Sequence, residues 1–201
     1  MDNLKYEKEL YQKGYERIAG VDEVGRGCIA GPVYACAIIM KPDSHIEGVT
    51  DSKKLTDKKR RELMAKILAE CVCYQIIAID NQKIDEINIL EASRLAMEKG
   101  IKALAVKPDF ILTDAMKLHT KIPYLDLIKG DLLSYTIACA SIVAKVSRDD
   151  YMIELAKKYP EYGYDKNKGY PTKAHKEALK KYGVTRYHRK SYEPVKQLLE
   201  Q

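Results

Sequence analysis

Two strands joined by a glycine-rich loop are predicted for residues 17–40, which read RIAGVDEVGRGCIAGPVYACAIIM. The first eight residues have the pattern of a strand, and the next eight carry the glycines and the proline of a turn. The last eight form an almost continuous apolar run of strand length. Such a run is typical of a central strand that is buried on both faces. A sheet is therefore expected at the centre of the fold.

Helices and further strands alternate along the rest of the chain. Apolar residues recur at helical spacing after Thr56 and after Asn88, and short apolar runs lie between these segments. Three adjacent strand candidates followed by this alternation predict an α/β domain with a mixed sheet flanked by helices. The elements expected after residue 40 are a helix capped by Thr56, a strand at 71–80, a helix at 88–105, strands at 109–113 and 124–129, a helix from Ser134 to about Tyr159, and a helix between Thr172 and Gly183.

Length and composition fit one soluble globular domain. The chain has 201 residues, of which 46% are hydrophobic and 32% are charged. Its longest apolar runs, such as residues 33–40, are far shorter than the ~20 residues that span a membrane, and its charged N-terminus does not resemble a signal peptide. The five cysteines cannot all pair and lack the CxxC spacing of a zinc site. Reduced cysteines without a signal peptide make the cytoplasm the expected location.

Positive charge is concentrated at the C-terminal end. Residues 157–201 hold 12 Lys and Arg against 5 Asp and Glu, whereas residues 1–156 hold 23 against 24. We expect a single domain, with an α/β core at about 18–156 and a basic helical extension at 157–201 that faces a polyanion. The alternative is a solvated basic tail whose tyrosines are packing residues. Seven tyrosines are interleaved with the basic residues, a mixture that suits contacts with phosphates and sugars. They are Tyr159, Tyr162, Tyr164, Tyr170, Tyr182, Tyr187 and Tyr192.

Four acidic residues stand where charged side chains are costly. Asp22 and Glu23 interrupt an apolar strand, and Asp114 and Asp131 follow two later strands closely. If these strands are neighbours in one sheet, the carboxylates can gather and will repel one another without a countercharge. Two divalent cations would supply that charge and suit phosphodiester hydrolysis, and oxygen ligands favour Mg²⁺ or Mn²⁺ over zinc. The alternative for Asp114 and Asp131 is that each only starts a turn.

The segment Gly25-Arg26-Gly27 directly follows the acidic pair. Glycines let backbone amides approach a ligand closely, and an arginine between them can bind a phosphate. The loop is therefore suited to hold a nucleic-acid backbone beside the metals, although by itself it indicates no more than a tight turn. Successive strand residues point to opposite faces, so both acids reach one site only if the strand ends or twists there, which Gly25 permits.

Five motifs follow one another between about residues 18 and 195. They are GVDEVGRG at 20–27, DSKKL at 51–55, KGD at 129–131, ASIVAKVSRD at 140–149 and KGYPT at 168–172. Together they resemble the ribonuclease HII family, the type 2 ribonucleases H. The resemblance implies a ribonuclease H-like fold with a helical C-terminal extension. It also implies an endonuclease that cuts the RNA strand of RNA:DNA hybrids and nicks 5′ to single ribonucleotides in DNA, with Mn²⁺ or Mg²⁺ as cofactor and 3′-hydroxyl and 5′-phosphate products.

The resemblance implies that the four acids are the family's metal ligands. The family's third acid is usually followed by Gly-Asn, whereas Asp114 is followed by Ala115 and Met116. This departure concerns the shape of the local loop and not the carboxylate. The chain also lacks the extra N-terminal domain of ribonuclease HIII, which favours type HII. The implied ligands are Asp22, Glu23, Asp114 and Asp131.

Five other residues are implied to bind the substrate. The family's glycine-arginine-glycine loop recognises the 2′-hydroxyl and the adjoining phosphate at an RNA–DNA junction, and its tyrosine packs on the sugar there. A lysine of DSKKL is expected near the metals and phosphates. Because the 2′-hydroxyl separates RNA from DNA locally, reading it beside the scissile bond would let the enzyme find a single ribonucleotide. The implied residues are Gly25, Arg26, Gly27, Lys53 and Tyr170.

Two other functions stay open at this point. One is another two-metal nuclease or phosphoryl transferase on the same fold, which would ignore a duplex carrying one ribonucleotide. The other is a hybrid-binding protein without activity, which Asp22→Asn would leave unaffected. The expected partners are an RNA:DNA hybrid and DNA that contains ribonucleotides, with no membrane, no obligate protein partner and a monomeric state. The four histidines lack metal-ligand spacing, so surface or structural roles are expected for them.

Overall fold

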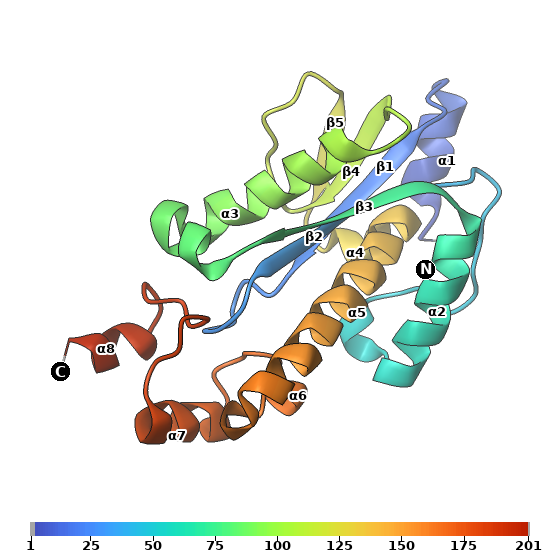
Figure 1. The fold of residues 1–201 in the computed structure, drawn as a ribbon. Helices are drawn as coiled ribbons and strands as arrows, with labels where there is room; N and C mark the ends of the chain where they lie inside the picture. Colours follow the sequence, from blue (N-terminus) through green and yellow to red (C-terminus); the bar gives the residue numbers. More distant parts are fainter. Residues whose placement is uncertain (1–2, 201) are drawn as a thin grey trace.

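A five-stranded sheet lies at the centre of the computed structural model, which describes residues 3–200 (Figure 1). Its strands are β1 (Ile18–Val24), β2 (Val33–Met40), β3 (Cys71–Ile79), β4 (Phe110–Asp114) and β5 (Tyr124–Leu127). They are ordered β3-β2-β1-β4-β5 across the sheet. β2 is antiparallel to both β1 and β3, whereas β4 is parallel to both β1 and β5. The mixed sheet expected from the sequence is confirmed.

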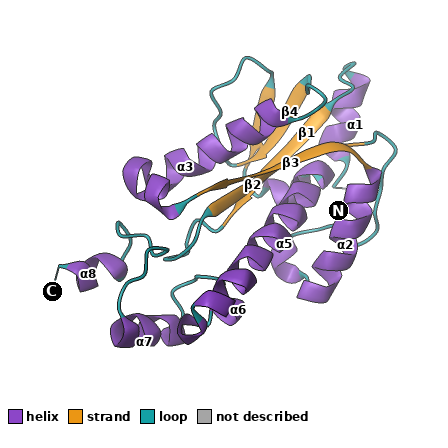
Figure 2. Ribbon diagram, in the orientation of Figure 1, coloured by secondary structure: helices purple, strands orange, loops and turns teal. Residues whose placement is uncertain are grey.

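Helices cover both faces of this sheet (Figure 2). The long helices are α2 (Asp57–Glu70), α3 (Asn81–Ala103) and α5 (Tyr135–Lys158). α3 packs on one face, and α2 and α5 pack on the other, so β2 is buried on both sides as its apolar run predicts. The shorter helices are α1 (Lys5–Gln12), η1 (Ser52–Lys54), α4 (Gly130–Leu133), η2 (Pro160–Tyr162), α6 (Tyr164–Asn167), α7 (Lys173–Tyr182) and α8 (Val195–Leu199).

Side-chain caps begin three helices where the sequence predicts them. The hydroxyl groups of Thr56, Ser134 and Thr172 each accept a hydrogen bond from the backbone N–H three residues later. These bonds satisfy donors that would otherwise lack partners at the helix starts. The boundaries of α2, α5 and α7 therefore lie close to those expected.

The helix predicted at 88–105 begins earlier, at Asn81, where Asp80 is its cap. The difference arises at Asn88, whose φ of 66° interrupts the helix. The Asn88 side chain accepts hydrogen bonds from the backbone N–H groups of Leu90 and Glu91, as a cap does. The sequence pattern therefore detected the second part of α3 and missed the first.

The N-terminal helix α1 was not predicted, because half of its residues are charged. It is fixed by Glu7, a buried carboxylate at the start of α5. The Oε1 atom of Glu7 accepts hydrogen bonds from Ser134 Oγ at 2.6 Å and from the Thr136 N–H at 2.9 Å. A negative charge at a helix N-terminus is stabilised by the helix dipole. α1 is thereby tied to the end of α5 that lies near Asp131.

β1 and α5 approach each other closely at Gly20. A Cβ atom there would lie 2.7 Å from the Ile137 backbone nitrogen and would overlap the Thr136 backbone still more severely. Buried alanines on α5, among them Ala138 and Ala140, allow the same close packing along the helix. Gly20 is therefore required so that α5 can lie directly on the strand that carries Asp22.

The C-terminal segment packs against the far end of α5, at the lower left of Figure 1. Tyr162, Tyr164 and Leu179 form a core there with Met152 of α5 and Ile29 of the loop between β1 and β2. The expected division at residue 156 falls inside α5, so this helix belongs to both parts. A single domain with an extension stays a prediction, with α5 as the element that joins its parts.

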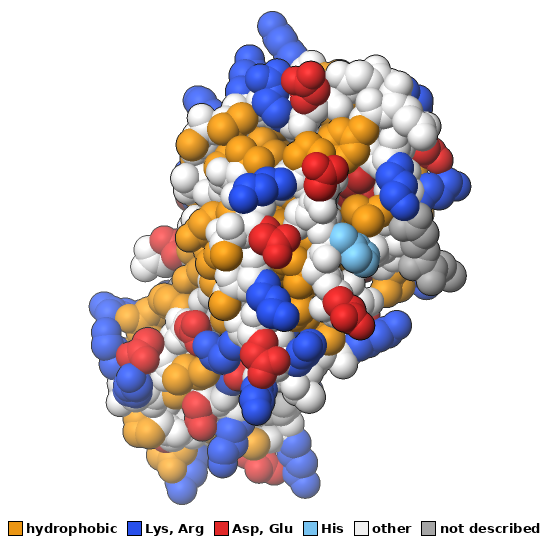
Figure 3. Space-filling model, turned by 90° about the vertical axis from the view of Figure 1, so that its right-hand side faces the viewer, with side chains coloured by type: hydrophobic (Ala, Val, Ile, Leu, Met, Phe, Trp, Pro, Cys, Tyr) orange, Lys and Arg blue, Asp and Glu red, His pale blue; other side chains and the backbone are white. Residues whose placement is uncertain are grey.

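Charges of both signs are mixed on the face shown in Figure 3, which is the right-hand side of Figure 1. Within residues 3–200, no helix is long and apolar enough to cross a membrane. All five cysteines are free thiols.

Candidate active site

Acidic residues lie where the parallel strands of the sheet end. The ladder between β1 and β4 ends at the pair Val21 and Thr113, immediately before Asp22 and Asp114. Asp131 lies in α4, shortly after β5, which is parallel to β4. The carboxyl ends of parallel neighbours meet at one edge of a sheet, which is where α/β proteins bind ligands. The sheet order therefore brings together acids that are far apart in the sequence.

A cavity of about 480 Å³ opens at this edge. Of the residues proposed from the sequence, Asp22, Glu23, Asp114, Lys53 and Tyr170 line it. Asp131 is not among the lining residues but lies beside Asp114, whose Oδ1 accepts a hydrogen bond from the Gly130 N–H at 2.7 Å. The residues that sequence reasoning did not single out are Val24, Ser52, Arg60, Ser141 and Lys145.

Asp22 and Glu23 both reach the cavity although they are successive strand residues. They directly precede Val24, the last residue of β1, and Gly25 follows with a φ of 97°. This left-handed conformation turns the chain sharply and favours glycine. The Oδ1 atom of Asp22 accepts a hydrogen bond from the Glu23 N–H at 2.7 Å. Successive residues within a strand point to opposite faces, but β1 ends and the chain turns directly after these two residues, so both side chains reach the cavity.

The negative charges in this cavity disfavour one another. Burial, followed by the charges of Glu23 and Asp114, raises the pKa of Asp22 well above its usual value, against a hydrogen bond from Ser141. Burial also raises the pKa of Glu23, which the Arg26 guanidinium partly offsets. Burial and the charge of Asp114 raise the pKa of Asp131, against Lys53. The site therefore gains from any cation that enters it.

The donor set fits hard divalent cations. Glu23 Oε2 is buried and has no hydrogen-bond partner, although its Oε1 atom accepts one from Arg26 at 3.3 Å. The acids around the cavity offer oxygen atoms only, as Mg²⁺ and Mn²⁺ prefer. Within residues 3–200, no three Asp, Glu, His or Cys side chains are arranged to hold one ion. Several acid oxygens instead accept protein hydrogen bonds, which a cation would replace.

The loop between β1 and β2 is held by two buried arginines. Arg148 of α5 donates to the carbonyl oxygens of Pro32 at 3.0 Å and Lys168 at 2.8 Å. Arg189 donates to the carbonyl oxygens of Gly31 at 3.0 Å and Arg26 at 2.9 Å. Both guanidinium groups are fully buried. These hydrogen bonds hold the backbone of the loop against α5 and the C-terminal segment.

Tyr170 lies beside the glycine-arginine-glycine loop. A Cβ atom at Gly27 would lie 3.9 Å from Tyr170 Cε1, so loop and ring are neighbours. Tyr170 is 37% exposed, and Lys145 Nζ lies 6.0 Å from the centroid of its ring. Lys53 lies on η1, where the Asp51 side chain accepts a hydrogen bond from its backbone N–H at 2.9 Å. Of the residues proposed for the substrate, Lys53 and Tyr170 therefore line the cavity, whereas Gly25, Arg26 and Gly27 do not. Arg26 is joined to the site by its 3.3 Å contact with Glu23.

Three residues missed by sequence reasoning lie one helical turn apart on α5. They are Ser141, Lys145 and Asp149, at a spacing of four that places them on one helix face. Lys145 Nζ pairs with Asp149 Oδ1 at 2.8 Å, and Arg60 of α2 approaches Asp149 at 3.9 Å. This spacing within ASIVAKVSRD was the signal available in the sequence, because three polar residues on one face of an apolar helix need partners.

Ala115 follows Asp114 with a φ of 46°, a left-handed conformation. Glycine adopts this conformation without strain, so the backbone has the shape that a glycine would give. The Ala115 N–H donates to the Leu127 carbonyl at 3.0 Å, and Met116 is buried. The departure from Gly-Asn therefore leaves a turn in place after the acid.

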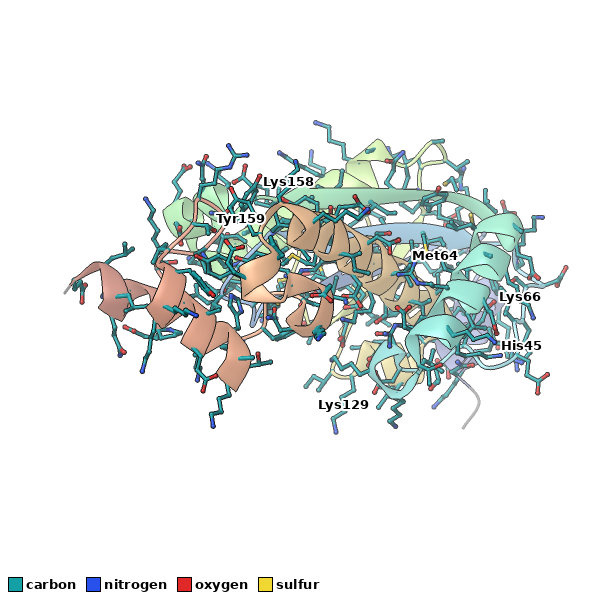
Figure 4. The ribbon with its side chains drawn as sticks, turned by 60° about the horizontal axis from the view of Figure 1, so that its bottom comes forward. His45, Met64, Lys66, Lys129, Lys158 and Tyr159 are labelled. Atoms are coloured by element: carbon teal, nitrogen blue, oxygen red, sulfur yellow. The ribbon has the colours of Figure 1, made fainter. Side chains whose placement is uncertain are left out.

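The histidines divide between surface and core. His119 is exposed, and His45 lies beside α2, at the right of Figure 4. His175 and His188 are fully buried in the C-terminal segment. Lys129, which precedes α4, projects outward at the lower edge of the same view. Within residues 3–200, neither a histidine nor a cysteine lines the acidic cavity.

Comparison with known proteins assigns the family. The family model described as Ribonuclease HII matches residues 19–195. The chain belongs to the ribonuclease HII family. A ribonuclease HII of Ligilactobacillus salivarius is 53% identical over 98% of this chain and 78% of its own length, and one of Shouchella clausii is 51% identical over 95% and 74%. The ribonuclease H2 structure from Pyrococcus horikoshii superposes with a TM-score of 0.79 at 28% identity, covering 92% of this chain and 97% of that chain.

Membership in the ribonuclease HII family states the class of reaction. The protein is an endoribonuclease of the ribonuclease H class, a hydrolase that acts on the RNA of hybrids. The ribonuclease H-like fold expected from the motifs is confirmed by the sheet and by this superposition. The two other functions that the sequence left open are therefore set aside.

Proposed function

We propose that this enzyme hydrolyses the RNA strand with two divalent cations, Mg²⁺ or Mn²⁺, and that it nicks DNA on the 5′ side of a single embedded ribonucleotide. The observation that carries the proposal is the cavity where acids and substrate-facing residues meet. Asp22, Glu23 and Asp114 line it together with Lys53 and Tyr170. In a protein that only bound hybrids, buried acids with an unpartnered oxygen would be a cost without a catalytic gain.

The four acids would hold the cations, which when bound activate a water molecule and stabilise the attacking and leaving oxygens of the phosphodiester. Asp22 and Glu23 approach from the end of β1, Asp114 from the end of β4 and Asp131 from α4. Rigid elements carry all of them, so little rearrangement of the backbone is needed to position the ligands.

The loop and the tyrosine would read the junction. The backbone of Gly25 and Gly27 is open to close approach, and Arg26 supplies a guanidinium for a phosphate. Tyr170, next to Gly27, would pack on the sugar that follows the ribonucleotide. Lys53 and Lys145 would face the phosphates beside the acids. A 2′-hydroxyl bound at this loop would lie next to the scissile bond, which selects RNA over DNA.

A duplex with one ribonucleotide tests the proposal. With Mn²⁺ or Mg²⁺ we expect a single nick 5′ to the ribonucleotide, leaving 3′-hydroxyl and 5′-phosphate ends, as mapped on a sequencing gel. Chelation should stop the reaction, and either ion should restore it. An all-DNA duplex of the same sequence is the matched control. Cleavage that continues at its normal rate after chelation would contradict the metal mechanism.

The basic C-terminal segment would grip the duplex, so binding should weaken with salt. We expect the affinity for a hybrid to fall on the order of a hundredfold between 50 and 200 mM salt, measured by fluorescence anisotropy. Neutralising Lys180 and Lys181 of α7 together should flatten this dependence. A salt dependence that is flat in the unaltered protein would rule out the segment as a phosphate-binding surface.

We further propose that the enzyme acts as a cytoplasmic monomer without an obligate partner.

A further inference from the structure

Two imidazole rings lie in contact inside the C-terminal segment. His175 of α7 and His188 are both fully buried, and their Nε2 atoms are 3.3 Å apart. The rings of Tyr162 and Tyr164 pack around them, and the Tyr164 hydroxyl lies 3.4 Å from His188 Nε2. No reaction step proposed above uses either histidine.

The partners of the two rings fix where each hydrogen lies. His175 Nδ1 is 2.9 Å from the Tyr170 carbonyl oxygen, which only accepts, so this nitrogen carries a hydrogen. His188 Nδ1 is 3.0 Å from the Thr185 N–H, which only donates, so this nitrogen is bare. In neutral rings the remaining hydrogen lies on His188 Nε2 and is donated to His175 Nε2. A continuous chain of hydrogen bonds therefore runs from Thr185 to Tyr170.

This chain joins the two elements that face the junction. One end holds the carbonyl group of Tyr170, whose ring borders the substrate cavity. The other end belongs to the segment paired with the loop between β1 and β2, because His188 forms a β-bridge with Ala30. The Arg189 N–H also donates to the Ile29 carbonyl at 2.8 Å. The imidazole pair therefore spans from the loop segment to the tyrosine.

We propose that His175 and His188 are positioning residues that set the selectivity for single ribonucleotides, by holding Tyr170 in register with the glycine-arginine-glycine loop. The inference rests on the function proposed above for Tyr170. This role needs both rings to be neutral, because a proton added to His175 Nε2 would place two N–H groups against each other across 3.3 Å. The pair would then separate, and the Tyr170 carbonyl would keep only its hydrogen bond from the Thr172 N–H at 2.8 Å.

The surroundings favour the neutral pair. Burial lowers the pKa of His175, and burial together with His175 lowers the pKa of His188 to about 4. The titratable groups that face the rings are the hydroxyls of Tyr162 and Tyr164, and no residue in 3–200 forms an ion pair with either ring. An unfolded histidine binds its proton near pH 6.5. The pair therefore disfavours the folded state increasingly as the pH falls from about 6.5 toward 4.

Two substitutions at His175 separate the hydrogen bond from the packing. Asparagine carries an amide nitrogen at the same distance along the side chain as Nδ1 and can donate to Tyr170, whereas leucine fills the space and cannot. We expect His175→Leu to lower, by about tenfold, the ratio of kcat/KM for a single-ribonucleotide duplex to kcat/KM for a long hybrid. His175→Asn should restore most of this ratio. The ratio of the unaltered enzyme should fall as the pH approaches 4, where the buried pair takes up a proton, and the His175→Asn ratio should depend less on pH.

Tyr162→Phe is the matched control, because it removes a hydrogen bond to the Gly183 carbonyl from the same core without touching the imidazole chain. It should lower thermal stability and leave the ratio unchanged. Equal ratios in His175→Leu and the unaltered enzyme, or equal losses in all three variants, would overturn the proposal.

Nitrogen-15 NMR of the imidazoles in the full chain gives a reading that does not depend on activity. At pH 7 we expect both rings to be neutral, with the hydrogen on Nδ1 of His175 and on Nε2 of His188. A charged ring or the opposite tautomers would overturn the proposal. If the unaltered enzyme fails to nick the single-ribonucleotide duplex, the proposed function fails, and the NMR result still decides whether the pair exists.

Discussion

Asp22→Asn is expected to abolish cleavage, with a loss in kcat of about a thousandfold or more, while hybrid binding stays within a few-fold of normal. Asparagine keeps the size of the side chain but removes a negative charge where a cation would be held. Stabilisation of the transition state by metals is worth several kcal/mol, and each 1.4 kcal/mol is tenfold in rate. Single-turnover cleavage and anisotropy binding on the same hybrid measure the two quantities. Asp114→Asn should behave in the same way.

Asp126→Asn provides the control for this experiment. Asp126 lies on β5 and is exposed, and it does not line the cavity. The Asp126→Asn substitution should leave cleavage unchanged.

Because burial and neighbouring acids raise the pKa of Asp22, the Asp22→Asn substitution should also make the folded protein more stable without metal. Near-normal cleavage by Asp22→Asn would remove this carboxylate from the active site.

Gly20→Ala is expected to destabilise the fold by roughly 3 kcal/mol, lowering the melting temperature by about 10 °C. The added methyl group would overlap the backbone of Thr136 and Ile137, which cannot move aside as a side chain would. α5 must then shift from β1, carrying Ser141 and Lys145 away from the acids. Thermal unfolding followed by circular dichroism measures the loss.

The matched control for Gly20 lies on the other face of the sheet. At Gly100 of α3 a Cβ atom would make an ordinary contact of 3.4 Å with the Ala37 Cβ. Gly100→Ala should leave stability unchanged or raise it slightly, since alanine favours a helix. If both variants are equally stable, the close approach of α5 to β1 does not depend on the missing side chain at Gly20.

Much of the fold could be predicted because its strands have clear periodicity. The apolar run of β2 indicated a strand buried on both faces, and the structure places it between two helical layers. Side-chain caps at Thr56, Ser134 and Thr172 marked helix starts without any tertiary information. The first part of α3 escaped because Asn88 restarts the helix, so the local pattern had two starts.

The site was predictable in its acids but not in its supporting residues. Asp22 and Glu23 stood out because they interrupt an apolar strand, and strand ends indicated Asp114 and Asp131. Arg148 and Arg189 act through carbonyl groups of a distant loop, and no sequence pattern records which backbone a side chain will meet. His175 and His188 lacked metal-ligand spacing, and their contact depends on how α7 folds back.

Helix α5 also limits where this chain can change in length. Ser141, Lys145 and Arg148 project from it toward three different partners, and each helical residue turns the chain by about 100°. A single inserted residue between Ser141 and Arg148 would rotate Arg148 and the whole C-terminal segment out of alignment with the loop it contacts. Tolerated insertions and deletions therefore belong to the more exposed parts of the connections, at residues 41–43 and 119–121, where added length leaves the helical register intact.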